Sequence, residues 1–296
     1  MAQSTPAYYV PDQSYWPIIA AAGLFFTLGG TGLLLYSMQQ EQASLFGQII
    51  LFSGILILAG MFFGWFATVI AESSKGLYSH KLDKSFRFGM SWFIFSEVMF
   101  FFAFFGALFY VRVFAVPWLG GEGDKGISNM LWPQFNAVWP LLNAPSPEQF
   151  PPIKAIIEPW HVPFINTILL VSSSFTIVFA HKALKLGQRN LVKLWLGATI
   201  ILGLSFLSLQ VIEYAEAYQH LDLTLNSGIY GATFFLLTGF HGAHVTIGSI
   251  ILIVLLFRVF KGHFTQDNHF AFEAGSWYWH FVDVVWVLLF TLVYVL

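Results

Sequence analysis

Seven stretches of this sequence are each long enough to cross a lipid bilayer once, and they are apolar almost throughout. They cover residues 16–36, 46–70, 88–116, 160–180, 191–214, 229–257 and 272–296. A helix needs about 20 apolar residues to span the hydrocarbon core of a membrane. Charged residues make up only 9% of the chain, against about 25% in typical soluble proteins. We therefore predict an integral membrane protein.

The seven segments are expected to be helices rather than the strands of a barrel. Backbone groups within lipid must be hydrogen-bonded inside the protein, and the segments lack the alternating pattern of barrel strands. The predicted fold class is all-α, one membrane domain over residues 1–296. The net charge of −2 argues against nucleic-acid binding. The chain contains no cysteine, which excludes disulfides, iron–sulfur clusters and thiolate copper sites on it.

The positions of the basic residues predict the orientation of the chain in the membrane. Of the 13 Lys and Arg residues, all but three lie in or beside the loops after the second, fourth and sixth segments. The exceptions are Arg112, Lys125 and Lys154. Basic residues favour the cytoplasmic side. We therefore expect a cytoplasmic N-terminus and a C-terminus on the opposite side, as seven crossings require.

The connection between the third and fourth segments, residues 117–159, differs from the other loops. It contains most of the prolines of the chain and the aromatic residues Trp132 and Trp139. Proline interrupts regular helix, and tryptophan favours the headgroup region. We expect a long outer loop with a short interfacial piece. It is either a structural cap on the bundle or a docking surface for a partner.

Glu97 lies ten residues beyond Arg87 within the third segment, which places it about 15 Å deep in a helix, near the centre of a core about 30 Å thick. Its neighbours are mostly phenylalanine. We expect the carboxyl to be largely protonated and hydrogen-bonded to a neighbouring helix or a trapped water. Two interpretations stay open: a proton-handling or small-ligand site, and a neutral polar contact between helices.

Further ionisable residues lie in the last two segments: His241, His244, Glu273, His280 and Asp283. Their spacings of three and seven put those of each helix on one face. A metal or haem site is one interpretation. Such a centre needs ligands that converge at one point, and Gly242 favours close helix packing. We therefore predict a polar packing network that holds no metal.

A separate group is expected at the inner membrane surface: Trp65, Glu72, Arg258, Lys261 and His263. An aromatic anchor beside cationic donors suits a phospholipid headgroup whose acyl chains lie between helices. The alternative is that these side chains only anchor the helices at the interface.

Several of these residues belong to segments that resemble one protein family. The segments are Arg87–Phe101, Pro163–Ser173, Gln210–Tyr214, Phe240–Val245 and Phe270–Trp286. In sequence and in order they resemble subunit III of cytochrome c oxidase in its bacterial form. Several long motifs with the correct spacing make this a specific resemblance.

The resemblance implies a fold in which the first two helices are separated from the other five by a lipid-filled cleft. It implies an accessory subunit without catalytic residues or redox centre, in the bacterial inner membrane. The partners it implies are subunit I, which holds the haems and copper of the oxygen site, and subunit II. The complex passes electrons from cytochrome c to oxygen and pumps protons, and subunit III supports proton uptake and protects subunit I during turnover.

The resemblance also assigns individual residues. Glu97 matches the buried carboxyl that hydrophobic carbodiimides modify, and four positions match those that hold cleft lipids: Trp65, Glu72, Arg258 and His263. His80 departs from the pattern, because relatives carry a histidine earlier in that loop. Three alternatives stay open: a proton-coupled transporter using Glu97, a haem-binding anchor using His241, His244 and His280, and subunit III of a quinol oxidase. Quinol-oxidase relatives typically lack the first two helices.

Overall fold

The computed structural model describes residues 9, 13–40, 42 and 44–296. Within those residues every regular element is helical, and seven helices are long and apolar enough to cross a membrane. They are α1 (Trp16–Gln39), α2 (Leu45–Ser74), α3 (His80–Tyr110), α6 (Val162–Lys185), α7 (Arg189–His220), α8 (Gly228–Phe260) and α9 (Phe270–Leu289). The prediction of an all-α chain with seven membrane helices is confirmed.

Short elements extend or connect these helices. A π-helical turn η1 (Val111–Ala115) and α4 (Val116–Leu119) continue α3, and a second π-helical turn η3 (Phe290–Val295) continues α9. The long helices also reach beyond the apolar segments: α3 begins at His80 rather than residue 88. The added turns carry polar residues such as Lys81 and Asp83, because a helix can continue past the lipid boundary into water.

The chain divides into two compact units, Met1–Phe86 and Arg87–Leu296. In the first unit, α1 packs against α2 through glycines. A Cβ atom at Gly30 would lie 2.4 Å from the backbone nitrogen of Leu51, and one at Gly54 would lie 2.4 Å from that of Thr27. Both contacts are with backbone, so a larger residue would push the helices apart. Small residues thus set the close approach of this pair.

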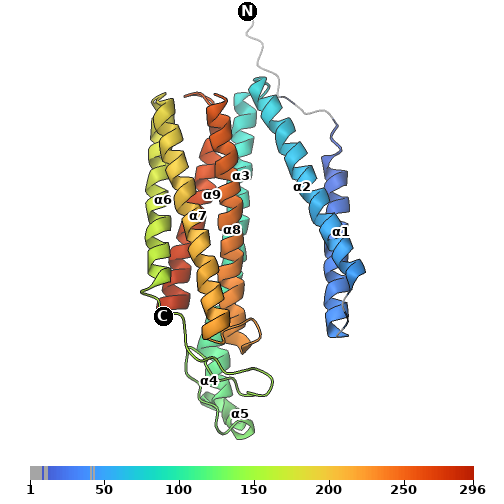
Figure 1. Cartoon of the computed structure of the whole chain (residues 1–296), viewed down its shortest axis with the longest axis vertical. Coiled ribbons are helices and arrows are strands. Elements are labelled where there is room, and N and C mark those ends of the chain that lie inside the picture. The colour runs from blue at the N-terminus through green and yellow to red at the C-terminus, as the bar shows by residue number, and fades with distance from the viewer. Residues whose placement is uncertain (1–8, 10–12, 41, 43) are drawn as a thin grey trace, which may run out of the picture. The chain divides into compact units, whose positions relative to one another are not determined.

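The second unit has α9 at its centre. Trp279 and Trp286 are completely buried, and their indole nitrogens donate hydrogen bonds to hydroxyls of α6, Trp279 to Ser173 over 2.8 Å and Trp286 to Thr167 over 2.9 Å. Figure 1 shows α9 among α6, α7 and α8. Buried indoles need such acceptors, so these bonds fix how α9 is seated.

The loop of residues 117–159 contains the 3₁₀ turn η2 (Gly123–Lys125) and the short helix α5 (Gly126–Leu131). Figure 1 shows α4 and α5 beyond one end of the five-helix unit. Leu141 and Ile153 are buried. Within the loop, the Lys154 amide donates to the Leu221 carbonyl, and the Lys154 ammonium lies 2.8 Å from the Asp222 carboxylate. The loop therefore packs on the α7–α8 connection.

Candidate functional site

Glu97 of α3 pairs with His244 of α8. The Glu97 Oε2 and His244 Nε2 atoms are 2.8 Å apart, and both side chains are largely buried. On the other side of the ring, Nδ1 lies 2.6 Å from the carbonyl oxygen of Phe240. A carbonyl only accepts, so Nδ1 carries a proton, and a neutral ring leaves Nε2 without one. The Glu97–His244 contact therefore holds one further proton, on either partner.

His241 lies one turn away on α8 in different surroundings. Its side chain is 1% exposed, and within the described part of the chain neither ring nitrogen has a hydrogen-bond partner. The ring lies 5.2 Å from the Trp286 ring and 5.7 Å from the Phe206 ring, centroid to centroid. His241 is thus packed as an aromatic ring.

His280 and Asp283 of α9 meet on Ser174 of α6. The Ser174 hydroxyl donates to Asp283 Oδ2 and lies 3.0 Å from His280 Nδ1. Because the hydroxyl has a single proton, Nδ1 is the donor in the second bond. His280 also borders an apolar groove of about 580 Å³ between α3 and α9. This group connects α6 and α9 and reaches the wall of that groove.

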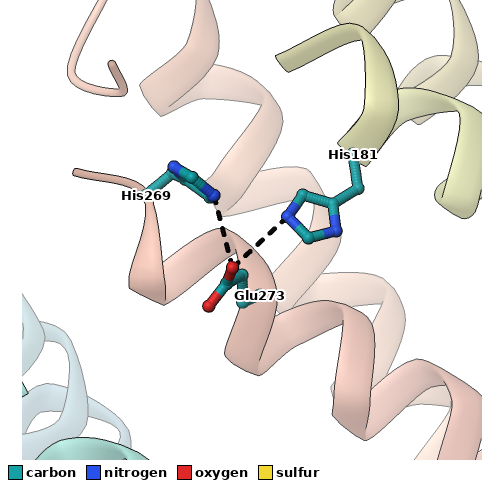
Figure 2. Close-up of side chains that lie close together, drawn as sticks. All are labelled: His181, His269 and Glu273. Atoms are coloured by element: carbon teal, nitrogen blue, oxygen red, sulfur yellow. Dashed lines mark ion pairs between the residues drawn. The ribbon is translucent and has the colours of Figure 1, made fainter. Parts of the chain in front are cut away.

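Glu273, in the first turn of α9, is surrounded by three cationic or potentially cationic side chains. Arg87 of α3 donates to Glu273 Oε2. The other carboxylate oxygen, Oε1, lies 3.3 Å from His269 Nε2 and 3.5 Å from His181 Nε2 of α6. Figure 2 shows both imidazoles directed at this carboxylate. Charges from three parts of the chain therefore meet at one end of the five-helix unit.

Glu97 and the residues of the predicted polar packing network lie in four separate environments. His244 pairs with Glu97, His280 with Asp283 and Ser174, Glu273 lies in the Arg87 cluster, and His241 is enclosed by rings. Shared faces place these residues on one side of a helix. Their height along the bundle decides which neighbouring helix each one meets.

Two of the predicted lipid-binding residues lie in the first unit. Trp65 is partly exposed and stacks on Phe66 with ring centroids 5.5 Å apart. The Glu72 carboxylate accepts a 2.9 Å hydrogen bond from the Tyr78 hydroxyl. Burial of the phenol and this carboxylate both raise the pKa of Tyr78, so Tyr78 remains a donor at neutral pH.

The other three lie in the second unit, at the end of α8 and just beyond it. The Arg258 guanidinium sits 4.4 Å above the Phe264 ring. Within the described residues, neither Arg258 Nε nor His263 Nδ1 has a hydrogen-bond partner, although both atoms are buried. Burial and the charges of Arg258 and Lys261 lower the pKa of His263. This segment therefore offers positive charge and unused donors.

Comparison with known proteins covers nearly the whole chain. The family model described as cytochrome c oxidase subunit III matches residues 6–145 and 127–296. A protein of Formosania lacustris named cytochrome c oxidase subunit 3 is 37% identical over 295 residues, which is 99% of this chain and 98% of its own length. The protein of that name from Arabidopsis thaliana is 36% identical over 289 residues, 97% and 96% of the two chains.

The chain belongs to the cytochrome c oxidase subunit III family. The resemblance inferred from the sequence motifs is confirmed. All the intramembrane groups described above involve residues of those motifs, since Glu97, His244, Glu273 and Asp283 each lie within a matching segment.

One buried carboxyl of this subunit III family member was not singled out from the sequence. Glu213 of α7 is 1% exposed. It accepts a 2.6 Å hydrogen bond from the Tyr294 hydroxyl and a 3.1 Å bond from Gln210 Nε2. Glu213 lies within the motif Gln210–Tyr214, and its position inside an apolar segment is the same signal that marks Glu97. Arg87, His181 and His269 were missed because charged residues at helix ends are ordinarily solvated.

Proposed function

We propose that this chain is an accessory subunit of a proton-pumping terminal oxidase that moves electrons from cytochrome c to oxygen. It flanks the haem–copper subunit I, with subunit II in the same complex, and carries no catalytic residue or redox centre of its own. The observation that carries this proposal is the full-length match to proteins named cytochrome c oxidase subunit 3.

Cytochrome c is the proposed electron donor, rather than a quinol, because the chain has the first two helices. The α1–α2 pair is complete, and the relatives compared above carry the cytochrome c oxidase name over the same length. The proposed location is the bacterial inner membrane, with the N-terminus in the cytoplasm. The orientation is supported by the distribution of Lys and Arg. These relatives are eukaryotic, so the bacterial location depends on the resemblance alone.

The haem and copper of the complex are assigned to partner subunits. Support comes from the surroundings of the three histidines considered for a haem anchor. His244 is engaged with Glu97, His280 with Ser174, and His241 lies between aromatic rings. A haem needs axial ligands on the two sides of one plane, and three histidines in three different contacts do not suit that role.

The second element of the proposal is a structural phospholipid in the cleft that the family resemblance implies. Its ligands are Trp65, Glu72, Arg258, Lys261 and His263. Support comes from the buried nitrogens Arg258 Nε and His263 Nδ1, which have no hydrogen-bond partner among the residues that the structure describes, since buried donors are nearly always satisfied. A phosphodiester would accept from both nitrogens and balance the local positive charge.

Glu97 has an indirect role in this proposal. Glu97 and His244 share one proton in their hydrogen bond. This arrangement suits a group that stabilises packing or local hydration beside subunit I. A proton-coupled transporter would need Glu97 to exchange protons with both sides of the membrane.

The first experiment is a mild-detergent pull-down of the tagged chain from its own membranes, followed by an optical spectrum and mass spectrometry. We expect a haem–copper subunit to co-purify, and the haem spectrum to leave with that subunit when this chain is stripped off. A colourless chain recovered alone would overturn the accessory role. Haem that remains on the stripped chain would favour the haem anchor instead.

The lipid proposal has a separate test, the Arg258→Ala variant. We expect the purified complex to lose one or more phospholipids per subunit and to lose activity faster over many turnovers. Arg112→Ala removes a matched charge from the opposite end of the five-helix unit and should change neither. Equal phospholipid content in all three preparations would contradict the assignment of Arg258.

A further inference from the structure

His181, His269 and Glu273 form the one group of metal-ligand residues close enough to share an ion within the described part of the chain. Figure 2 shows that they come from three places in the chain. His181 lies near the end of α6, His269 is the residue before α9, and Glu273 lies in the first turn of α9. Their ligand atoms all lie within 4.8 Å of one another. The fold therefore brings together two imidazoles and a carboxylate that are far apart in sequence.

The two imidazole nitrogens at this site are buried, and within the described residues they make no hydrogen bond. His181 Nε2 and His269 Nε2 are inaccessible to water, and among the residues described neither takes part in a hydrogen bond. The His269 side chain is 10% exposed. Its Nδ1 lies 3.2 Å from the Thr265 carbonyl oxygen, so Nδ1 carries the proton and Nε2 presents a lone pair to Glu273 Oε1. This is the tautomer that binds metals through Nε2.

The two separations from Glu273 Oε1 match those of a zinc coordination shell. Bonds of about 2.0–2.2 Å at tetrahedral angles place neighbouring ligand atoms about 3.3–3.6 Å apart. The observed distances from Glu273 Oε1 are 3.3 Å to His269 Nε2 and 3.5 Å to His181 Nε2. Without a cation, two acceptor atoms face each other across the first of these gaps.

The set of donors selects the class of metal. Imidazole nitrogens suit zinc and similar transition ions, whereas magnesium and calcium prefer shells of oxygen alone. Arg87 occupies the second oxygen of Glu273, which leaves Oε1 for the ion and orients the carboxylate. Arg87 also adds positive charge, and so does Lys185, which lies near His181. An ion that binds here must therefore form strong bonds to nitrogen.

We propose that His181 Nε2, His269 Nε2 and Glu273 Oε1 bind one Zn²⁺ ion, with a fourth position open to water. The ion joins the end of α6 to the start of α9. This differs from the expectation from sequence that the chain binds no metal, and it does not depend on the proposed function. The competing explanation is an ion-pair cluster in which one imidazole is protonated.

The test is metal binding by the purified full-length chain, prepared in detergent without a polyhistidine tag and stripped with a chelator. Zn²⁺ content is measured after equilibrium dialysis, and Co²⁺ is used as a coloured substitute for zinc. We expect one ion per chain and a strong visible absorption from four-coordinate Co²⁺. Glu273→Gln and His269→Gln should each weaken Zn²⁺ binding at least about tenfold, because each removes one of three protein ligands.

The control is His220→Gln, which removes an exposed histidine of the same unit that lies outside the group. This variant should bind Zn²⁺ like the unmodified chain. His269→Gln keeps the Arg87–Glu273 pair, so it reports on metal binding even if Glu273→Gln disturbs the fold, and circular dichroism checks helix content. Zn²⁺ binding that is absent, or equally strong in His269→Gln, would overturn the proposal. The ion-pair cluster would then be the explanation.

Discussion

The two units of the chain are both helical and apolar, yet they are held together differently. Within α1 and α2, 11% of the residues of the most apolar window are buried, whereas in α9 the share is 50%. The first unit relies on glycines that let two backbones touch, such as Gly30 and Gly54. The second relies on large buried rings and on hydrogen bonds between helices, such as Trp279 to Ser173.

The difference shows that apolar composition alone does not predict a core. Lipid is as apolar as a leucine side chain, so helices in a membrane gain little by burying apolar surface against each other. Close packing and hydrogen bonds must supply the association. The second unit has both among α6, α7, α8 and α9, while α3 is joined to α8 and α9 through the hydrogen bonds of Glu97 and Arg87. The first unit has a single helix–helix interface, the one between α1 and α2. Its remaining surface suits contact with lipid or with other chains.

The largest effect is expected for Trp279→Ala. Trp279 is fully buried and packs on Gly203 and Gly248. Truncation leaves a cavity and removes the hydrogen bond that the indole donates to the Ser173 hydroxyl. We expect the free energy of unfolding of the second unit to fall by about 3–5 kcal/mol. Titration with a denaturing detergent in mixed micelles measures it. The matched change in the first unit is Trp65→Ala, which removes a partly exposed ring and should lower the free energy of unfolding much less. Equal losses of stability in the two variants would show that the two units do not differ in this way.

Gly54→Leu tests the close contact between α1 and α2. The added side chain would meet the backbone of Thr27, and overpacking typically costs about 1–3 kcal/mol. Because the chain has no cysteine, two cysteines introduced at Leu33 and Gly47 can report how closely α1 and α2 approach each other. A Cβ at Gly47 would lie 3.3 Å from that of Leu33, close to disulfide range.

We expect Gly54→Leu to reduce the yield of this cross-link several-fold under mild oxidation. Gly60→Leu is the control, because a Cβ at Gly60 meets nothing within 4 Å among the described residues. Its cross-link yield should equal that of the cysteine pair without a further substitution. An unchanged yield in Gly54→Leu would mean that the two helices do not depend on close backbone contact.

Glu97→Gln tests a polar contact of the second unit. The amide can still hydrogen-bond to His244, so we expect intact assembly and a loss of stability of about 1 kcal/mol. Labelling by a hydrophobic carbodiimide should disappear, as measured by mass spectrometry of the labelled peptide. Glu213→Gln is the matched control, since Glu213 is also a buried carboxyl, and it should leave labelling at Glu97 unchanged. Label that persists in Glu97→Gln would place the reactive carboxyl elsewhere.

The smallest effect is expected for Tyr78→Phe in the first unit. It removes the hydroxyl that donates to Glu72, a loss of about 0.5–1.5 kcal/mol for a typical hydrogen bond. Partial exposure to water should keep the effect at the low end. Detergent titration measures it against Tyr218→Phe, a half-exposed tyrosine of α7. A loss comparable to that of Trp279→Ala would show that the first unit depends on polar contacts after all.

The sequence was sufficient to predict the helices and to place Glu97 within one of them. It was not sufficient to pair Glu97 with His244, because the pairing depends on how far α3 and α8 are rotated and shifted. The same limit applies to Gly30 and Gly54, which look like any other glycine until the crossing point of α1 and α2 is known. It also applies to Glu273, whose partners His181 and Arg87 come from the ends of two other helices.

The central position of α9 has a consequence for biosynthesis. The helices that surround it, α6, α7 and α8, precede it in the chain and therefore enter the membrane first. Until α9 and η3 follow, Ser174 and Glu213 lack the Asp283 and Tyr294 partners to which they bond in the completed bundle. Polar groups without partners are costly in lipid, so the incomplete bundle is less stable than the finished one. A chain that stopped before residue 270 would thus lack the central helix that joins α6, α7 and α8 into one bundle.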